Sequence, residues 1–124
     1  MQLASQSPKS LLIYDGDCAF CRRCVDYGRR LTRDAVAYRP YQEVAEEVPQ
    51  IPIERLRSAA QFVDRGGIIC SGAEAVFRAL SYAPRWRGLL WLYTRIRPFA
   101  ALSEMVYRWV ARHRNGLSCL LGLN

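Results

Sequence analysis

The 124-residue sequence lacks the features that define several large classes of protein. The uncharged stretches in its basic C-terminal part, such as residues 88–94, are far shorter than the ~20 apolar residues that span a bilayer. The opening residues contain no apolar segment of signal-peptide length. There is no internal repeat and no low-complexity segment. We therefore expect one cytoplasmic domain over residues 1–124, with residues 1–9 frayed.

Cysteine is present, but in neither the number nor the spacing of a disulfide scaffold. The five cysteines are an odd number, and three of them crowd into seven positions: Cys18, Cys21 and Cys24. The remaining two, Cys70 and Cys119, stand far apart, and we expect Cys70 to belong to the core. Such a pattern indicates redox or metal chemistry more than structural cross-linking.

Negative charge is scarce at one end of the chain. The net charge is +7, and residues 85–124 supply +6 of it, because seven arginines are accompanied there by Glu104 alone. One interpretation is that the helices expected over 85–114 pack on the sheet with their arginines in water. The other is that these basic helices dock an acidic protein or a membrane surface. No nucleic-acid-binding motif accompanies the charge, so we expect no nucleic-acid partner.

Hydrophobic patterns and turn residues predict the element order β-α-β-α-β-β-α, followed by two further helices. An initial strand, helix and strand imply a parallel pair with a crossover, and the later hairpin adds antiparallel strands to the same sheet. Helices then cover both faces, which describes a thioredoxin-like α/β fold. The expected strands are 11–14, 36–39, 60–63 and 68–70. The expected helices are 19–33, one short helix within 42–57, 73–82 capped by Ser71, and two C-terminal helices, 86–96 and 100–113, divided by Pro98.

Cys18 and Cys21 lie where the first predicted strand meets the first predicted helix. A thiol at a helix N-terminus faces unpaired backbone N–H groups and the positive end of the helix dipole, and both favour the thiolate. The two-residue spacing brings both sulfurs to one helical turn, so one thiol can resolve a mixed disulfide on the other. We predict that Cys18, at the exposed helix start, attacks and that Cys21, on the apolar face, resolves. Their redox-active disulfide would need no further cofactor.

Charged residues flank this pair with conflicting effects. Arg22 lies one turn after Cys18 and is predicted to stabilise its thiolate, whereas Asp15 and Asp17 place negative charge nearby. The sequence therefore indicates a redox pair without indicating its reduction potential. We hypothesise that Asp15 orients the loop or relays a proton during the resolving step.

Cys24 extends the spacing to C-x2-C-x2-C and introduces metal binding as an alternative. A ferredoxin-type run needs a fourth cysteine near position 28, where the chain has glycine. A zinc site would have to recruit Cys119 or His113 as its fourth ligand. Because Cys24 falls on the apolar stripe of the predicted helix, we expect a buried structural thiol and no metal. His113 is expected to cap a helix or to be solvated.

The run at residues 14–21 resembles the signature of the DCC family of thiol-disulfide oxidoreductases. That family is named for an Asp-x-x-Cys-x-x-Cys motif, which Asp15, Cys18 and Cys21 match. The resemblance covers about residues 11–115. It implies a thioredoxin-like fold, a dithiol–disulfide site at the two cysteines and an accessory role for the aspartate. Further likeness lies at residues 71–75 and 107–112.

One departure from the related thioredoxins concerns substrate handling. Thioredoxins place a cis-proline before the third strand, whereas Ser58 and Ala59 stand at that point here, and Pro52 is too far upstream to be placed there. A peptide disulfide is therefore not implied as the substrate.

Two functions follow from these observations. The leading hypothesis is a thiol-disulfide oxidoreductase acting on an unidentified disulfide or dithiol, in the cytoplasm or peripheral to the membrane. The alternative is a non-catalytic thioredoxin-like binding module, whose cysteines are structural or zinc-bound and whose basic helices dock a partner.

Overall fold

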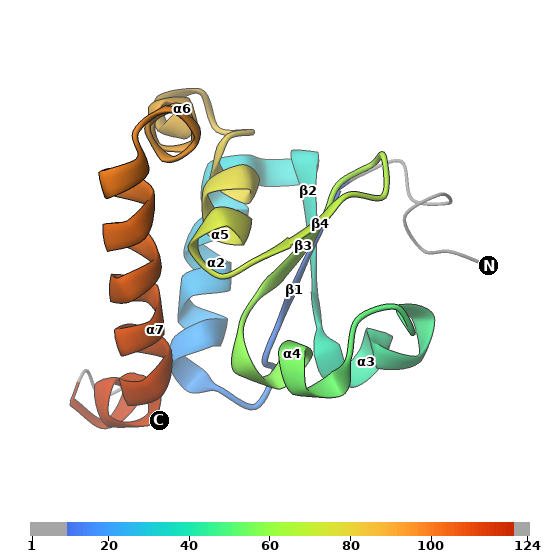
Figure 1. Ribbon diagram of the computed structural model, residues 1–124. Coiled ribbons are helices and arrows are strands. Elements are labelled where there is room, and N and C mark those ends of the chain that lie inside the picture. The colour runs from blue at the N-terminus through green and yellow to red at the C-terminus, as the bar shows by residue number, and fades with distance from the viewer. Residues whose placement is uncertain (1–9, 121–124) are drawn as a thin grey trace.

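The computed structural model describes the backbone of residues 10–120 and the side chains of residues 10–114 and 116. A mixed four-stranded sheet lies at its centre (Figure 1). β1 runs parallel to β2 and antiparallel to β3, and β3 pairs with β4 as an antiparallel hairpin. The strand order β2-β1-β3-β4 gives the predicted thioredoxin-like arrangement. The strands are β1 (Ser10–Tyr14), β2 (Val36–Pro40), β3 (Gln61–Val63) and β4 (Ile69–Ser71).

Helices cover both faces of this sheet. One face packs against α2 and α5, and the other lies beneath the segment that contains α3 and α4 (Figure 1). The last helix, α7, forms an outer layer beside α2 and α5. None of the described helices is both long and apolar enough to cross a membrane. The helices are α2 (Ala19–Thr32), α3 (Tyr41–Val44), α4 (Ile53–Ser58), α5 (Ala73–Leu80), α6 (Arg87–Arg95) and α7 (Arg97–Leu120), with 3-10 turns at Arg33–Ala35, Ala45–Glu47 and Pro84–Trp86.

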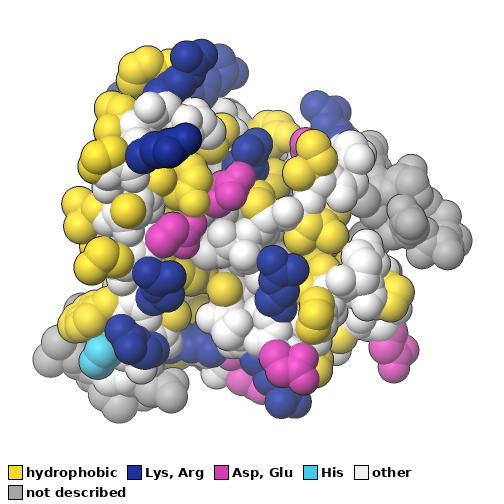
Figure 2. Space-filling view, viewed as in Figure 1, with side chains coloured by type: hydrophobic (Ala, Val, Ile, Leu, Met, Phe, Trp, Pro, Cys, Tyr) yellow, Lys and Arg dark blue, Asp and Glu magenta, His cyan; other side chains and the backbone are white. Residues whose placement is uncertain are grey.

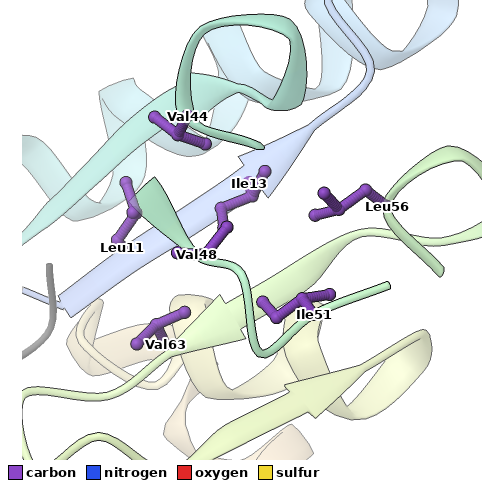
Figure 3. Packing of buried hydrophobic residues seen from close by; sticks show 7 residues of the cluster. All are labelled: Leu11, Ile13, Val44, Val48, Ile51, Leu56 and Val63. Atoms are coloured by element: carbon purple, nitrogen blue, oxygen red, sulfur yellow. The ribbon is translucent and has the colours of Figure 1, made fainter. Parts of the chain in front are cut away.

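The apolar run of β1 is continuous because both faces of this strand are buried. Successive side chains of a strand point to opposite faces, so Leu11 and Ile13 join one cluster and Leu12 joins the other. The first cluster packs under the α3–α4 segment (Figure 3), and its members are Leu11, Ile13, Val44, Val48, Ile51, Leu56 and Val63. The second packs under α2 and α5, and its members are Leu12, Val25, Val36, Tyr38, Phe62, Ala75 and Ala79.

Two prolines lie at the starts of helices in the structure and do not interrupt them. Pro98 is the second residue of α7, not the divider between two helices, because the first turn of a helix does not need its N–H group. The break falls at Ile96, and α7 continues well beyond the predicted end. Pro52 likewise stands at the N-cap of α4, so the 42–57 segment holds two short helices where one was predicted.

The N-terminus of α5 is capped from a distant helix and not by Ser71. Gly72 occupies the N-cap with a φ of 69°, a backbone conformation that residues other than glycine rarely adopt. The carboxylate of Glu104, on α7, accepts the backbone N–H of Ala73 at 3.2 Å and that of Glu74 at 3.4 Å. A Cβ on Gly72 would lie 2.7 Å from Glu104 Oε1. A negative charge is favoured at this end of the helix dipole, so Glu104 holds α7 against α5.

Candidate functional site: a dithiol at the start of α2

Cys18 is the N-cap of α2, where helices ordinarily place serine, threonine or aspartate. Its sulfur accepts a hydrogen bond from the backbone N–H of Cys21 at 3.2 Å. The prediction of an exposed Cys18 is wrong, because only 5% of the residue is exposed. The capping geometry gives the reason, since the side chain folds back over the first turn instead of pointing into water. The sulfur therefore lies against the positive end of the helix dipole.

Cys21 lies one turn later, half-buried, and differs from Cys18 in its electrostatic surroundings. Burial raises the pKa of Cys21 to about 12, and a hydrogen bond and the charge of Cys18 contribute in the same direction. Arg114 acts against these effects and lowers the pKa. A thiol with so high a pKa stays protonated at neutral pH. Its proton is therefore available for the hydrogen bond between the two thiols.

Arg114 comes from the far end of the sequence and joins the dithiol to the loop before it. Its Nη1 donates to the sulfur of Cys21 at 3.5 Å. Its Nη2 forms an ion pair with Asp15 Oδ2 at 3.3 Å and donates to the carbonyl of Arg57 at 3.0 Å. Both members of the ion pair are largely shielded from water. The charge of the C-terminal helices and the chemistry of the cysteines therefore meet in space.

The turn that leads into Cys18 is held by a second residue that the sequence did not indicate, Gln42 at the start of the α3–α4 segment. Its amide oxygen accepts the N–H of Gly16 at 3.0 Å, and its amide nitrogen donates to Asp15 Oδ1 at 2.9 Å. Asp15 Oδ1 also accepts the N–H of Asp17 at 3.0 Å. A Cβ on Gly16 would lie 2.7 Å from the Cβ of Pro40, so this turn needs glycine. Asp15 thus contacts Gln42 through one carboxylate oxygen and Arg114 through the other.

We expect Gln42→Ala to lower the free energy of unfolding by about 1–2 kcal/mol, because Gly16 and Asp15 each lose a partner. Urea unfolding followed by circular dichroism measures this change. Gln50→Ala is the matched control, since Gln50 is exposed and makes no described side-chain hydrogen bond. Equal stability of the two variants would show that the clamp contributes nothing.

Arg22 and Asp17 both lie at the site, and the described hydrogen bonds of their side chains hold the loop before Cys18. The guanidinium of Arg22 donates to the carbonyl of Gly16 at 2.7 Å, so it holds the turn and makes no described hydrogen bond to Cys18. Asp17 is exposed, and its Oδ2 accepts from Gln42 at 3.3 Å. Both residues therefore act on the shape of the loop.

Cys24 is exposed, which corrects the prediction of a buried structural thiol. The buried residues of α2 are Val25, Gly28 and Thr32. The buried stripe is therefore rotated around the helix axis relative to the face that the apolar pattern predicts. Cys24 falls at the edge of this buried stripe and lines a cavity that α7 also lines.

Cys70 and His113 make no described hydrogen bond to the dithiol. Cys70 is half-buried and packs against the second core cluster, and burial together with the Glu74 carboxylate raises its pKa to about 11. His113 is exposed, and its Nδ1 lies 2.7 Å from the carbonyl of Trp109. The side chain of Cys119 lies outside the described residues. Within the part that the structure describes, no three histidine, cysteine or acidic side chains form a group that could hold a metal ion.

An apolar cavity of about 790 Å³ lies between α2, α5 and α7, directly beside the dithiol. Cys21 and Cys24 line it from α2, and Val110 lines it from α7. This volume is in the range of sites that bind small molecules or apolar side chains. Such a cavity, with a thiol in its wall, can hold the apolar part of a ligand close to the two sulfurs.

The start of β3 is contacted by a side chain of α7. All described peptide bonds are trans. The N–H of Ala60, which immediately precedes the strand, donates to the hydroxyl of Tyr107 at 2.8 Å. α7 thus occupies a backbone donor close to the dithiol.

Comparison with known proteins agrees with this geometry. A family model described as DCC1-like thiol-disulfide oxidoreductase matches residues 12–120. No curated protein and no solved structure gives a significant match.

Proposed function

The chain belongs to the DCC1-like thiol-disulfide oxidoreductase family, and from this premise we propose that it exchanges disulfides through Cys18 and Cys21. The observation that carries the proposal is the cap of α2. There the Cys18 sulfur accepts the Cys21 N–H, while Cys21 keeps its proton.

The proposed reaction has two exchange steps. The Cys18 thiolate attacks one sulfur of the substrate disulfide, the substrate S–S bond breaks, and the other sulfur leaves as a thiolate that takes a proton. Cys21 then loses its proton and attacks the Cys18 sulfur, which releases the second substrate thiol and forms the Cys18–Cys21 disulfide. Two electrons pass from the protein to the substrate, and the same steps in reverse oxidise a dithiol substrate.

The two thiols suit these roles for different physical reasons. Cys18 caps the N-terminus of α2, where its sulfur accepts the backbone N–H of Cys21. Cys21 is held neutral until Cys18 is consumed. Once a mixed disulfide forms, the charge of Cys18 is gone, and two of the three influences that raise the pKa of Cys21 disappear with it. Arg114 then acts with less opposition, so the resolving thiol becomes more acidic when it is needed.

Treatment of the reduced protein with glutathione disulfide tests the proposal. We expect peptide mapping by mass spectrometry to find a disulfide between Cys18 and Cys21, and the Cys24→Ser protein to form the same bond. Metal analysis of the purified protein provides the opposite outcome. About one bound zinc per chain, with Cys18, Cys21 and Cys24 all unreactive, would favour the non-catalytic binding module.

A further inference from the structure

Exposed apolar side chains gather on the two C-terminal helices. Nine large hydrophobic residues are exposed in the described part of the chain, and six of them belong to α6, α7 or the residue between. Figure 2 shows hydrophobic side chains along the outer edge of the molecule, where α7 runs in Figure 1. The six are Trp91, Ile96, Leu102, Met105, Val106 and Trp109.

Four of these residues form a continuous outer stripe on α7: Leu102, Met105, Val106 and Trp109. Their spacing of three, four and seven positions places them on one face of the helix. Met105 is the most exposed of the four, at 60%. The inward side of α7 is already occupied, because Glu104 caps α5 and Tyr107 contacts the start of β3. Leu102 and Val106 also line the cavity beside the dithiol, and Trp109 stacks on His113 of the same helix, but each of the four stripe residues is more than half exposed.

Arginines border the outer stripe on one side. At 100° per residue, Arg97, Arg108 and Arg112 fall beside it, all three are exposed, and none takes part in a described ion pair. The only acidic residue in 85–124 is Glu104, whose carboxylate is turned inward to α5. The outer surface of α7 thus combines apolar side chains with uncompensated positive charge.

We propose that the outer stripe of α7 and its bordering arginines dock the protein on an anionic lipid surface. A helix that presents tryptophan and aliphatic side chains beside arginines suits the boundary between acyl chains and negatively charged headgroups. The apolar side chains leave water, Trp109 takes the interfacial position that indoles prefer, and the arginines meet phosphates.

Charge and shape favour lipid over the other possible occupants. A two-fold contact through the outer stripe with the two α7 helices antiparallel would bring the arginine borders of both chains together, which electrostatic repulsion opposes. α7 lies as a single helix at the outer edge of the fold (Figure 1). A flat fluid surface can lie along such a helix over its whole length, whereas a protein partner would need a matching groove lined with acids.

The test is co-sedimentation of the full chain with vesicles of phosphatidylcholine, with and without phosphatidylglycerol. We expect binding only to the anionic vesicles, weakened by salt. Met105→Gln combined with Trp109→Gln should lower the affinity at least about tenfold, because two apolar side chains no longer enter the interface. Arg108→Gln and Arg112→Gln should each lower it about fivefold. All four side chains are exposed, so these variants are expected to fold.

Ile68→Gln is the matched control, since Ile68 is 64% exposed but lies in the β3–β4 hairpin, away from α7. Unchanged affinity in this variant, together with the losses above, supports the proposal. Absence of binding to anionic vesicles overturns it. Binding that depends on the arginines and not on Met105 and Trp109 also overturns it, because that is non-specific attraction of a basic protein. A dimer in analytical ultracentrifugation that the stripe variants abolish, without vesicle binding, assigns the surface to a second copy.

Discussion

Replacing Cys21 with serine is expected to trap the substrate on Cys18 as a mixed disulfide, whereas replacing Cys18 with serine is expected to abolish exchange. The two thiols occupy different places in the proposed reaction, because Cys18 caps α2 and Cys21 is held protonated beside it. Without Cys21 the first step still occurs, but the second has no nucleophile. Without Cys18 there is no attack, and turnover should fall about a thousandfold or more.

Mass spectrometry after addition of glutathione disulfide distinguishes the two variants. The Cys21→Ser protein should carry one glutathione, mapped to Cys18, and the Cys18→Ser protein should carry none on Cys21. Cys24→Ser is the matched control, since Cys24 lies on the same helix and lines the same cavity but caps nothing. Adducts of equal extent on both variants would contradict the assignment of attacking and resolving roles.

Replacing Arg114 with glutamine is expected to slow the second step by about tenfold to 100-fold at neutral pH. Resolution requires the Cys21 thiolate, and Arg114 is the group whose charge and hydrogen bond lower the pKa of that thiol. Below this pKa the rate rises about tenfold for each pH unit, since the thiolate fraction does. Loss of the guanidinium raises the pKa, so the whole profile of rate against pH moves to higher pH.

The measurement starts from a mixed disulfide between Cys18 and glutathione and follows glutathione release over a range of pH. Arg114→Lys should restore part of the rate, because it keeps the positive charge. Arg112→Gln is the matched control, since Arg112 is an exposed arginine of the same helix without a described contact to the site. A slower rate with an unshifted pH profile would mean that Arg114 only holds α7 in place.

The sequence predicts the elements that build the fold more reliably than the contacts that complete the site. The β1 run, the α2 helix and the β3–β4 hairpin are local patterns of burial and backbone preference, and the structure has all three. Gly67, in the turn of the hairpin, has a positive φ of 89°. These signals depend on neighbours within a few positions, so one sequence is enough to detect them.

Arg114 and Gln42 could not be found in the same way. Asp15 meets Gln42 across 27 positions and Arg114 across 99, and neither spacing leaves a periodic pattern. In the sequence, Arg114 is one more positive charge in a basic segment. The lack of an acidic residue near it in the sequence is the only indication that its partner lies in a distant segment. Once the sheet places α7 against α2, the ion pair becomes possible.

The errors at Cys18 and Ser71 have a common cause in helix capping. The position of a residue in the sequence indicates that it can cap a helix or attack a disulfide. It does not indicate the direction in which the side chain points. At the first site the thiol folds back over α2 and becomes buried. At the second, a carboxylate from α7 supplies the cap, and Gly72 leaves room for it. Tertiary structure decides which group satisfies a helix end.

The shallow anchoring of α7 has a consequence for the dynamics of the protein. None of the described side chains of α6 or α7 is fully buried, in contrast to α2 and α5. Such elements open at a lower free energy than the core, as a cooperative unit whose amide hydrogens exchange early. That opening withdraws Arg114 from Cys21 and Tyr107 from Ala60 in one event. The boundary between the slowly and rapidly exchanging parts of the chain thus runs through the dithiol. By reciprocity, a charge on Cys21 that strengthens the contact with Arg114 also favours the closed position of α7.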